Sequence, residues 1–249
     1  MSLHRPVRPE ARTYRRISGA GNLQRFRVVV KETDLQVQAA TDLSRRCREL
    51  IIRERGYLEA FIKQHPRFLT ALTPWPASAP APPMVAAMID ASRSAGVGPM
   101  AAVAGALAES VGRDLLGCSE EVIVENGGDI FLALNQPATV GIDAGRSPLS
   151  GQLGLRFAAD DLPLAICTSS GTIGHSRSYG KAEAVCVVAR RGALADASAT
   201  AVANRIAEPR DLSAAIEFAG TIEGLIAVVA VCRDQMGAWG DVEIVPLKY

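Results

Sequence analysis

Two short strand-like runs joined by a tight turn constrain the fold of this chain more than any other segment. Residues 121–125 and 130–134 are rich in β-favouring side chains, and Asn126, Gly127, Gly128 and Asp129 separate them. A pair of asparagine and glycine between two such runs is a strong hairpin signal, because these residues tolerate the backbone angles that a tight turn needs. This segment therefore predicts an antiparallel pair of strands.

Further strands follow the same pattern. Residues 26–30 and 35–39 flank a polar turn, which indicates a second hairpin. Single strands are expected at 138–142, 154–158, 162–167 and 182–189, and a terminal hairpin at 225–233 and 241–247, joined through 237–240. Because these strands cluster as hairpins and do not alternate steadily with helices, we expect an α+β fold with a largely antiparallel sheet.

Helical periodicity separates the strand-rich regions. A long helix is expected to begin at a cap, either Thr41 or Asp42, and to end before Pro66. A loop rich in proline and alanine is expected over 70–83. Further helices are expected at 84–95, 99–116, 193–207 and 211–220, with a turn at 96–98 between the first two. At 249 residues with 48% hydrophobic residues, the chain is expected to form a single domain over 1–249.

Charge and hydropathy exclude several classes of function. The net charge is +1, so no overall field attracts nucleic acid or an anionic membrane surface. The basic tail over 1–20 lacks the apolar run of a secretory signal, and no apolar run is long enough to span a membrane. We therefore expect a cytoplasmic protein that binds neither nucleic acid nor membrane.

The five cysteines are widely spaced and form no Cys-x-x-Cys pair, which disfavours both a zinc site and a disulfide framework. Cys47, Cys186 and Cys232 lie in apolar patterns and are expected to be buried. Cys167 ends a strand-like run just before a segment rich in serine and threonine. Its thiol is therefore either buried, like the others, or exposed with a pKa lowered by nearby backbone amides.

Residues 193–204 predict a helix that carries a polar stripe. Asp196, Thr200 and Asn204 recur every four residues, so their side chains share one helix face. These residue types form helices poorly, whereas a face that merely contacts water usually carries lysine and glutamate. One interpretation is a site for a hard cation such as Mg²⁺, which takes few protein oxygens and completes its shell with water or phosphate. The other is a packing face of small residues.

Three more segments have the composition of ligand-binding loops. Gly96, Gly98 and Met100 lie around the start of the helix at Pro99, where free backbone amides attract anions. Gly127 and Gly128 would expose amides in the hairpin turn, although a plain turn explains them equally well. Residues 168–181 are dense in hydroxyl groups and contain one histidine, His175, which can act as an acid or base near neutral pH.

These four segments are, in chain order, the glycine-rich helix start, the Asn-Gly-Gly-Asp turn, the serine-rich segment and the helix with the polar stripe. Together they resemble the ApbE superfamily of FAD:protein FMN transferases, and they look closest to its uncharacterised cytosolic side branch. The resemblance covers about residues 85–207 and depends most on the Asn-Gly-Gly-Asp and Ala-Asp-x-x-x-Thr elements at Asn126–Asp129 and Asp196–Thr200. Unlike those transferases, this chain has no charged residue between Gly96 and Gly105.

The resemblance implies a T-fold-like α+β structure, with FAD or a related nucleotide between the sheet and the helices, and Mg²⁺ on Asp196 and Thr200. In the transferases, a threonine of an acceptor protein attacks the FAD pyrophosphate and AMP leaves; the metal stabilises the developing charge. A protein acceptor and a homo-oligomer are therefore possible partners here. The implied catalytic residue is His175, and the implied cofactor contacts are Gly96, Gly98, Met100, Asn126, Gly127, Gly128, Asp129, Thr168, Ser169, Ser170, Gly171 and Lys181.

Two hypotheses of different classes follow. The first is a Mg²⁺-dependent transferase that acts on a flavin or nucleotide phosphate. The second is a non-enzymatic or sulfur-handling protein on the same scaffold, with Cys167 or Cys47 as a thiol carrier. The first requires the Asn-Gly-Gly turn and the serine-rich segment to converge on the carboxylate of Asp196.

Overall fold

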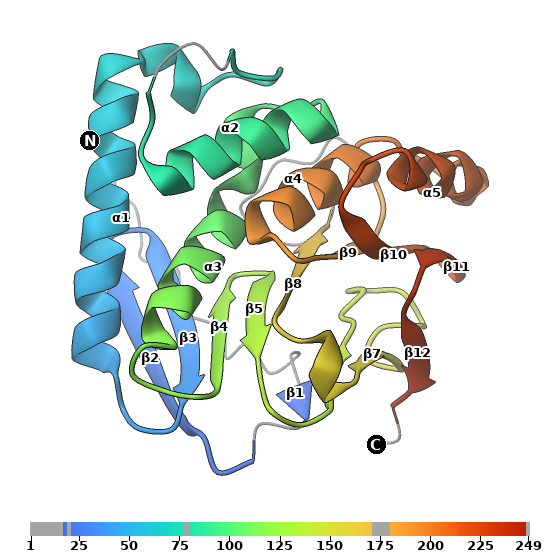
Figure 1. Ribbon diagram of the computed structural model, residues 1–249. Helices are drawn as coiled ribbons and strands as arrows, with labels where there is room; N and C mark the ends of the chain where they lie inside the picture. The colour runs from blue at the N-terminus through green and yellow to red at the C-terminus, as the bar shows by residue number, and fades with distance from the viewer. Residues whose placement is uncertain (1–16, 19–20, 77–79, 171–179, 248–249) are drawn as a thin grey trace, which may run out of the picture.

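The computed structural model has three layers: a group of helices, a large antiparallel sheet and a smaller sheet (Figure 1). It describes residues 17–18, 21–76, 80–170 and 180–247. The large sheet has eight strands in the order β11-β10-β9-β8-β5-β4-β3-β2, and the small sheet has four in the order β1-β6-β7-β12. Every pairing between the described strands is antiparallel. The α+β fold expected from the sequence is confirmed.

The strands of the large sheet, apart from β11, are close to those expected, and each hairpin turn joins neighbours in the sheet. They are β2 (Gln24–Val30), β3 (Thr33–Ala39), β4 (Val122–Asn126), β5 (Asp129–Ala133), β8 (Leu164–Ser169), β9 (Ala184–Ala189), β10 (Leu225–Cys232) and β11 (Gln235–Gly240). The small sheet contains β1 (Ile17–Ser18), β6 (Ala138–Gly141), β7 (Leu153–Phe157) and β12 (Glu243–Pro246).

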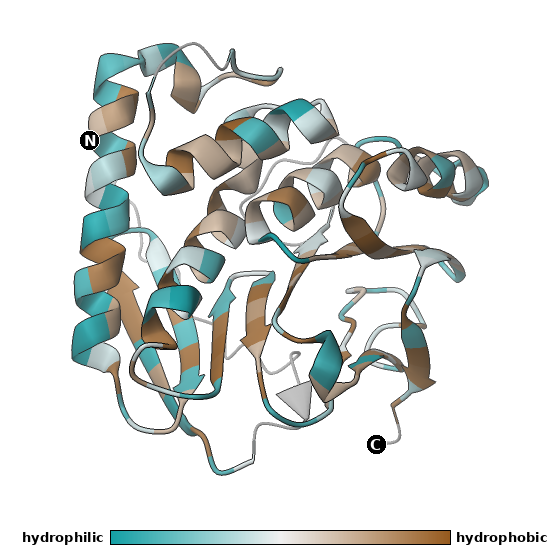
Figure 2. Cartoon of the chain, in the orientation of Figure 1, coloured by the Kyte–Doolittle hydropathy of each residue, from teal (hydrophilic) through white to brown (hydrophobic). Residues whose placement is uncertain are grey.

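Five α-helices lie on one side of the large sheet (Figure 1). They are α1 (Ser44–Gln64), α2 (Pro83–Ala95), α3 (Val103–Leu115), α4 (Gly192–Ala203) and α5 (Leu212–Gly220). Short 3₁₀ segments occur at Pro66–Leu69, Pro99–Ala102, Ala159–Asp161 and Pro209–Asp211. Helix α1 carries alternating hydrophilic and hydrophobic bands, in keeping with its position at the edge of the helical layer (Figure 2).

Period-two alternation places the strand side chains in two cores, because successive residues of a strand point to opposite faces. On the helical side, Phe131 packs with α1, α2 and α3, and Val187 packs with α4 and α5. On the opposite side, Ile130 and Leu132 pack against Leu155 of the small sheet. Burial on both faces explains why β5 and β9 are buried along their whole length.

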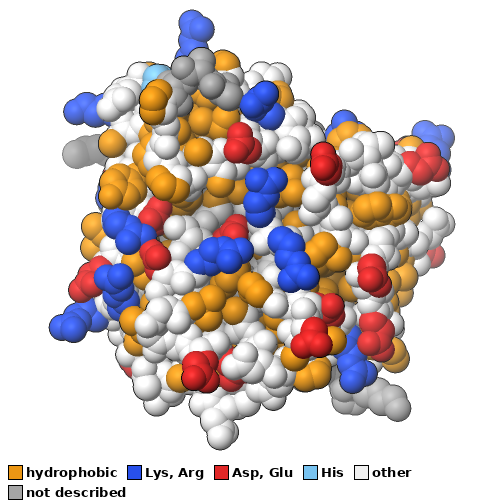
Figure 3. All heavy atoms as spheres, in the orientation of Figure 1, with side chains coloured by type: hydrophobic (Ala, Val, Ile, Leu, Met, Phe, Trp, Pro, Cys, Tyr) orange, Lys and Arg blue, Asp and Glu red, His pale blue; other side chains and the backbone are white. Residues whose placement is uncertain are grey.

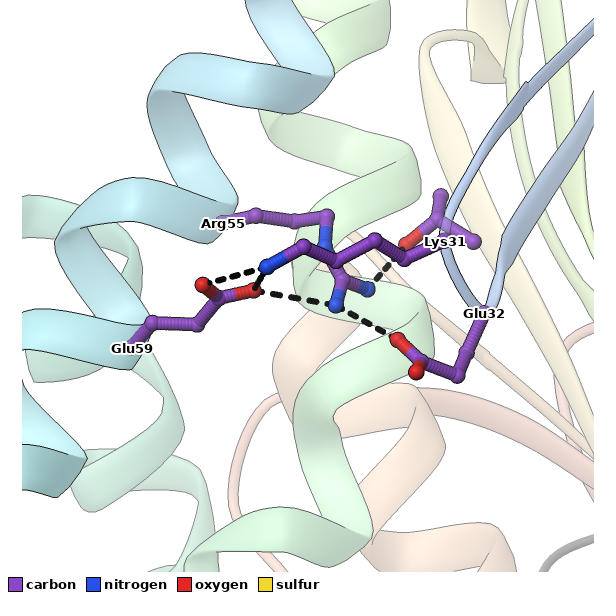
Figure 4. Close-up of polar contacts among 5 residues, drawn as sticks. Lys31, Glu32, Arg55 and Glu59 are labelled. Carbon is purple, nitrogen blue, oxygen red and sulfur yellow. Dashed lines mark hydrogen bonds and ion pairs between the residues drawn. The ribbon is translucent and has the colours of Figure 1, made fainter.

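A network of charged side chains fastens the β2–β3 turn to α1 (Figure 4). The Nζ of Lys31 contacts Glu59 at 2.7 Å, and the Arg55 guanidinium contacts Glu32 at 2.6 Å and Glu59 at 3.0 Å. Arg55 also donates to the Thr33 hydroxyl at 2.9 Å. Lys31 has a positive φ of 52°, so the network holds a turn whose backbone is unusual for a residue with a side chain.

The terminal hairpin predicted from the sequence is wrong. Strand β10 turns at Arg233 and pairs with β11, so the segment over 237–240 that was expected to be a loop is an edge strand. The chain then bends at Gly240, where φ is +94°, and β12 pairs with β7 in the small sheet. In the sequence, Gly237 and Gly240 resembled a turn. In the structure, Gly237 lies inside β11, and Gly240 lets the chain pass from the large sheet to the small one.

Two predicted helices are shorter than expected. The helix expected over 99–116 begins as a 3₁₀ segment, and α3 starts only at Val103. The helix expected over 193–207 ends at Ala203, and Asn204 is its C-cap. The polar stripe within the helix therefore consists of Asp196 and Thr200 alone. The cap predicted for α1 at Thr41 or Asp42 is wrong: Leu43 is the N-cap and makes no side-chain cap hydrogen bond, while Asp42, one residue earlier, accepts a hydrogen bond from the Ser44 amide.

The described part of the chain contains no single helix that is long and apolar enough to cross a membrane. Helix α2 and the segment Pro99–Leu115 reach that length and composition only together, across a bend of 108°. The face shown in Figure 3 carries lysine and arginine interspersed with aspartate and glutamate, as expected for a net charge of +1.

Candidate functional site

Helix α4 is buried on nearly all sides, and its polar stripe is the exception. The helix lies between the large sheet and α2 and α3, and ten of its residues are buried. The two that are not are Asp196 and Thr200. The small residues of α4 therefore form a packing surface, as the simpler interpretation expected, while the two stripe residues are only partly buried among the described residues.

Glycines allow α4 to approach α3 closely at the turn that carries Asp196. A Cβ atom on Gly105 would lie 2.3 Å from the Gly192 carbonyl oxygen, 2.8 Å from Asp196 Cβ and 2.9 Å from Cys167 Sγ. Real side chains do not tolerate such distances from backbone atoms, so only glycine fits this crossing. The close approach places the start of α3 within hydrogen-bond reach of Asp196.

The two helices cap each other across this crossing. Asp196 Oδ2 accepts hydrogen bonds from the amides of Ala104 at 3.0 Å and Gly105 at 2.9 Å, in the first turn of α3. Glu109 of α3 in turn accepts a hydrogen bond from the Gly192 amide at 2.6 Å, at the start of α4. Each carboxylate thus satisfies amides that a helix N-terminus leaves without an intrahelical partner. Asp196 Oδ1 takes no hydrogen bond from the described residues.

The Asn-Gly-Gly turn converges on the same point. Asn126 Nδ2 donates to the Ala104 carbonyl at 3.1 Å, and the Ala104 amide donates to Asp196. Because one residue joins both bonds, the amide nitrogen of Asn126 and the carboxylate of Asp196 lie within about 10 Å of each other. Asp129 pairs with Cys167 in the β5–β8 ladder and is buried. The convergence predicted for the Asn-Gly-Gly turn and Asp196 is confirmed.

The electrostatic environment of Asp196 favours a neutral carboxyl group or a bound cation. Burial raises its pKa well above the usual value, and the nearby negative charge of Asp129 raises it further, although the two backbone amides oppose these effects. A divalent cation between the two carboxylates would reverse this balance, because its positive charge favours the ionised form.

The thiol of Cys167 is buried, which excludes the alternative of an exposed thiol with a lowered pKa. Burial and the carboxylates of Asp129, Asp196 and Glu109 raise the pKa of this thiol well above its usual value. Burial also raises the pKa of Cys47 to about 12. Cys186 and Cys232 are buried, as expected, and Cys118 is exposed.

The residues of the serine-rich segment lie on different sides of the sheet. Ser169 has a buried hydroxyl without a hydrogen-bond partner among the described residues, and strand alternation places it on the same face as Cys167. Thr168 points to the opposite face, where it contacts Cys186 Sγ at 3.2 Å and lines a cavity of about 20 Å³ with Gly128. Thr168 and Asp196 are therefore separated by the sheet, so the predicted convergence of the serine-rich segment on Asp196 is wrong for Thr168.

The end of this segment lies at the far end of α4. The Lys181 amide donates to the Ile206 carbonyl at 2.7 Å, and a Cβ on Gly180 would lie 1.8 Å from the Ala203 carbonyl oxygen. The backbone of Lys181 thus lies beyond the C-terminal end of α4, which is about 10 Å along the helix axis from Asp196. Ser170 is partly buried between the end of β8 and this segment. Gly171 and His175 lie outside the described residues.

The glycines before α3 have structural roles. Gly96 ends α2 with a positive φ of 73° and donates to the Ser92 carbonyl. A Cβ on Gly98 would lie 1.7 Å from the Ala71 carbonyl oxygen, so this glycine lets the loop over 70–76 pack on the turn. Met100 packs partly buried against the core. Binding of a cofactor by these residues stays a prediction.

Sequence reasoning missed the residues that hold Asp196 in place. Ala104 acts through its backbone, which no side-chain pattern reveals, and Gly105 and Gly192 act through the absence of a side chain. Glu109 looked like an ordinary acidic residue on a helix surface. Its spacing from Arg113, which it contacts at 2.7 Å, is typical of a solvent-exposed pair, so the sequence offered no signal of its capping role.

Known proteins are similar to this chain over most of its length. A family model described as AbpE bacteria matches residues 15–232. A UPF0280 protein of Methanocella arvoryzae is 41% identical over 85% of this chain and 86% of its own length, and one of Methanocaldococcus jannaschii is 36% identical over 87% and 90%.

Solved structures share the fold at much lower sequence identity. The ApbE protein of Thermotoga maritima covers 86% of this chain and 96% of its own, with a TM-score of 0.54 and 12% identity. The apo flavinyl transferase ApbE of Pseudomonas stutzeri covers 91% and 95%, with a TM-score of 0.52 and 14% identity. On the family match and the archaeal relatives together, this chain belongs to the AbpE bacteria family, an ApbE-like branch that includes the UPF0280 proteins.

Proposed function

We propose that this protein is a Mg²⁺-dependent transferase that acts on a flavin or a related nucleotide phosphate at Asp196 and Thr200. The observation that carries the proposal is the burial pattern of α4. These two residues are the only positions of the helix that are partly rather than fully buried, and they recur one turn apart on one face. Likeness of fold supports the reaction class, since the Pseudomonas stutzeri structure is that of a flavinyl transferase.

Asp196 and Thr200 offer few protein oxygens, which suits Mg²⁺ better than a metal that takes all of its ligands from the protein. Within the described ranges, no three His, Cys, Asp or Glu side chains are grouped so that they could hold a metal ion. Mg²⁺ needs only one or two carboxylates, because water and phosphate oxygens complete its octahedral shell. Asp196 Oδ1 and the Thr200 hydroxyl would supply such a partial set. Asp129 would contribute a second negative charge close by.

The metal, when bound, would supply positive charge for a phosphate group that develops negative charge during transfer. The residues of the chain have more specific roles. Ala104 and Gly105 fix one oxygen of Asp196, which leaves the other free to face a ligand. The unpartnered hydroxyl of Ser169, on the same face of the sheet, is a candidate donor to a phosphate oxygen. The acceptor is proposed to be a protein hydroxyl group, as in the transferases that the chain resembles.

A pair of substitutions at Asp196 tests the proposal. Asp196→Asn keeps an oxygen that can accept the hydrogen bonds from Ala104 and Gly105 but removes the negative charge, whereas Asp196→Ala removes both. We expect isothermal titration with FAD, FMN and ADP in the presence of Mg²⁺ to show binding to the wild-type protein. Both variants should lose the Mg²⁺-dependent part of that binding, and only Asp196→Ala should also lose thermal stability.

Asp90 provides the control, because it is an exposed aspartate on the outer helix α2. Asp90→Ala should bind nucleotide like the wild-type protein. If the wild-type protein binds none of the three nucleotides with Mg²⁺, or if Asp196→Asn binds them equally well, the proposal is wrong.

The alternative of a thiol carrier has no support from the structure. A carrier thiol must be accessible and ionise readily, whereas Cys47 and Cys167 are buried and their pKa values are raised.

A further inference from the structure

We infer that the side chain of Asn126 is a positioning group for Asp196, and that it acts through the Ala104 peptide and does not itself bind the nucleotide. This inference rests on the proposed function of Asp196. It assigns to one residue of the Asn-Gly-Gly turn a role different from the cofactor contact that the resemblance implies.

The first support is the path of hydrogen bonds. Asn126 Nδ2 donates to the Ala104 carbonyl, and the amide of that same residue donates to Asp196 Oδ2. The carbonyl of Ala104 is bonded to β4 and its amide is bonded to α4. These two hydrogen bonds fix Ala104 relative to both elements. The Asn126 amide group therefore makes a contact inside the protein that sets its position relative to α3.

The second support is the location of this contact in the fold. Ala104 is the second residue of α3, where the helix has only just begun after a 3₁₀ segment. Amides in a first turn lack intrahelical acceptors, so the turn depends on outside partners for its conformation. Asp196 supplies the acceptor for the amides, and Asn126 supplies a donor for the carbonyl.

The third support is the charge of the surroundings. Asp129 lies at the other end of the two-residue turn, in register with Asn126, and its charge already acts on Asp196. An amide can donate a hydrogen bond here without adding another negative charge. Groups that hold a metal ligand in position from outside the coordination shell change metal affinity by about 10- to 100-fold when they are removed.

The test uses Asn126→Ala, with Asn135→Ala as the matched control. Asn135 is an exposed asparagine just beyond the other end of β5, so the control removes the same side chain from the same hairpin. Mn²⁺ is the probe because its binding can be followed by electron paramagnetic resonance without nucleotide. We expect Asn126→Ala to weaken Mn²⁺ binding by about 10-fold or more, and Asn135→Ala to leave it unchanged.

Hydrogen exchange of the Ala104 and Gly105 amides in metal-free protein provides a second measurement. Exchange should be faster in Asn126→Ala than in the wild type, because the turn loses one of its two anchors. Unchanged exchange would overturn the inference, as would a variant that binds Mn²⁺ normally but loses affinity for ADP, since that is the behaviour of a direct ligand. If wild-type protein binds no Mn²⁺ while the exchange difference is present, the proposed function fails and the link from Asn126 to Asp196 stands.

Discussion

A methyl group added at Gly105 should separate α3 from α4 and move Asp196 from its position. The new Cβ would lie 2.3 Å from the Gly192 carbonyl oxygen, whereas ordinary contacts begin near 3.4 Å. The helices must therefore move apart by about 1 Å, against a close-packed interior. Overpacking of this kind costs about 1 to 3 kcal/mol, and the better helix propensity of alanine returns about 1 kcal/mol.

We therefore expect Gly105→Ala to lower the free energy of unfolding by up to about 2 kcal/mol, which for a chain of this size lowers Tm by up to about 8 °C. Gly56→Ala is the matched control, because Gly56 is helical and nothing lies within 4 Å of its added Cβ. That substitution should stabilise the protein by about 0.5 to 1 kcal/mol.

Urea denaturation of both variants, followed by circular dichroism, gives the two free energies, and a Mn²⁺ titration reports the effect on the site. Gly105→Ala should bind Mn²⁺ more weakly than Gly56→Ala. If Gly105→Ala gains stability as Gly56→Ala does, the close crossing of α3 and α4 is wrong, and so is the position assigned to Asp196.

Three further predictions follow from single contacts. A thiol reagent at pH 8 should modify Cys118 in the native protein and leave Cys167 unmodified, which mass spectrometry checks; rapid modification of Cys167 would contradict its burial. Hydrogen bonds from the Glu208 and Ala207 amides lower the pKa of Asp211, so the stability it contributes is present at neutral pH and lost as pH falls below about 4. The Tm of Asp211→Asn should therefore lie below that of the wild type at pH 7 and approach it at pH 3, and a gap that is independent of pH would refute this. Glu59→Gln should cost less than about 1 kcal/mol in chemical denaturation, because the side chains of Glu59 and Lys31 are 46% and 59% exposed; a larger loss would show that the network in Figure 4 is more than a set of surface ion pairs.

Local patterns predicted much of the fold. The Asn-Gly-Gly-Asp turn joins β4 to β5 as expected, with Asn126 and Asp129 as the final pair of the ladder. The long helix expected before Pro66 is likewise present as α1, Ser44–Gln64. These features are determined by residues that are close together in the sequence. Hydrophobic periodicity reports such local preferences, so it can predict them.

The errors occurred where distant contacts decide the local structure. Gly237 lies in an edge strand because β10 is available as a partner, and Gly240 bends the chain toward β7, on which β12 then pairs. Neither partner can be identified from the residues nearby. The same limit applies to the candidate site, where the stripe of Asp196 and Thr200 was visible in the sequence but the anchors at Ala104, Gly105 and Glu109 lie on another helix.

The most direct test of a divalent cation at Asp196 is anomalous diffraction from crystals grown with Mn²⁺ and ADP. We expect one strong anomalous peak at about 2.1 Å from Asp196 Oδ1, the distance of an octahedral oxygen site, with Thr200 beside it and a phosphate oxygen of ADP in the same shell. An ordered ADP molecule with no anomalous peak near Asp196, or with its metal held by other residues, would contradict the proposed site.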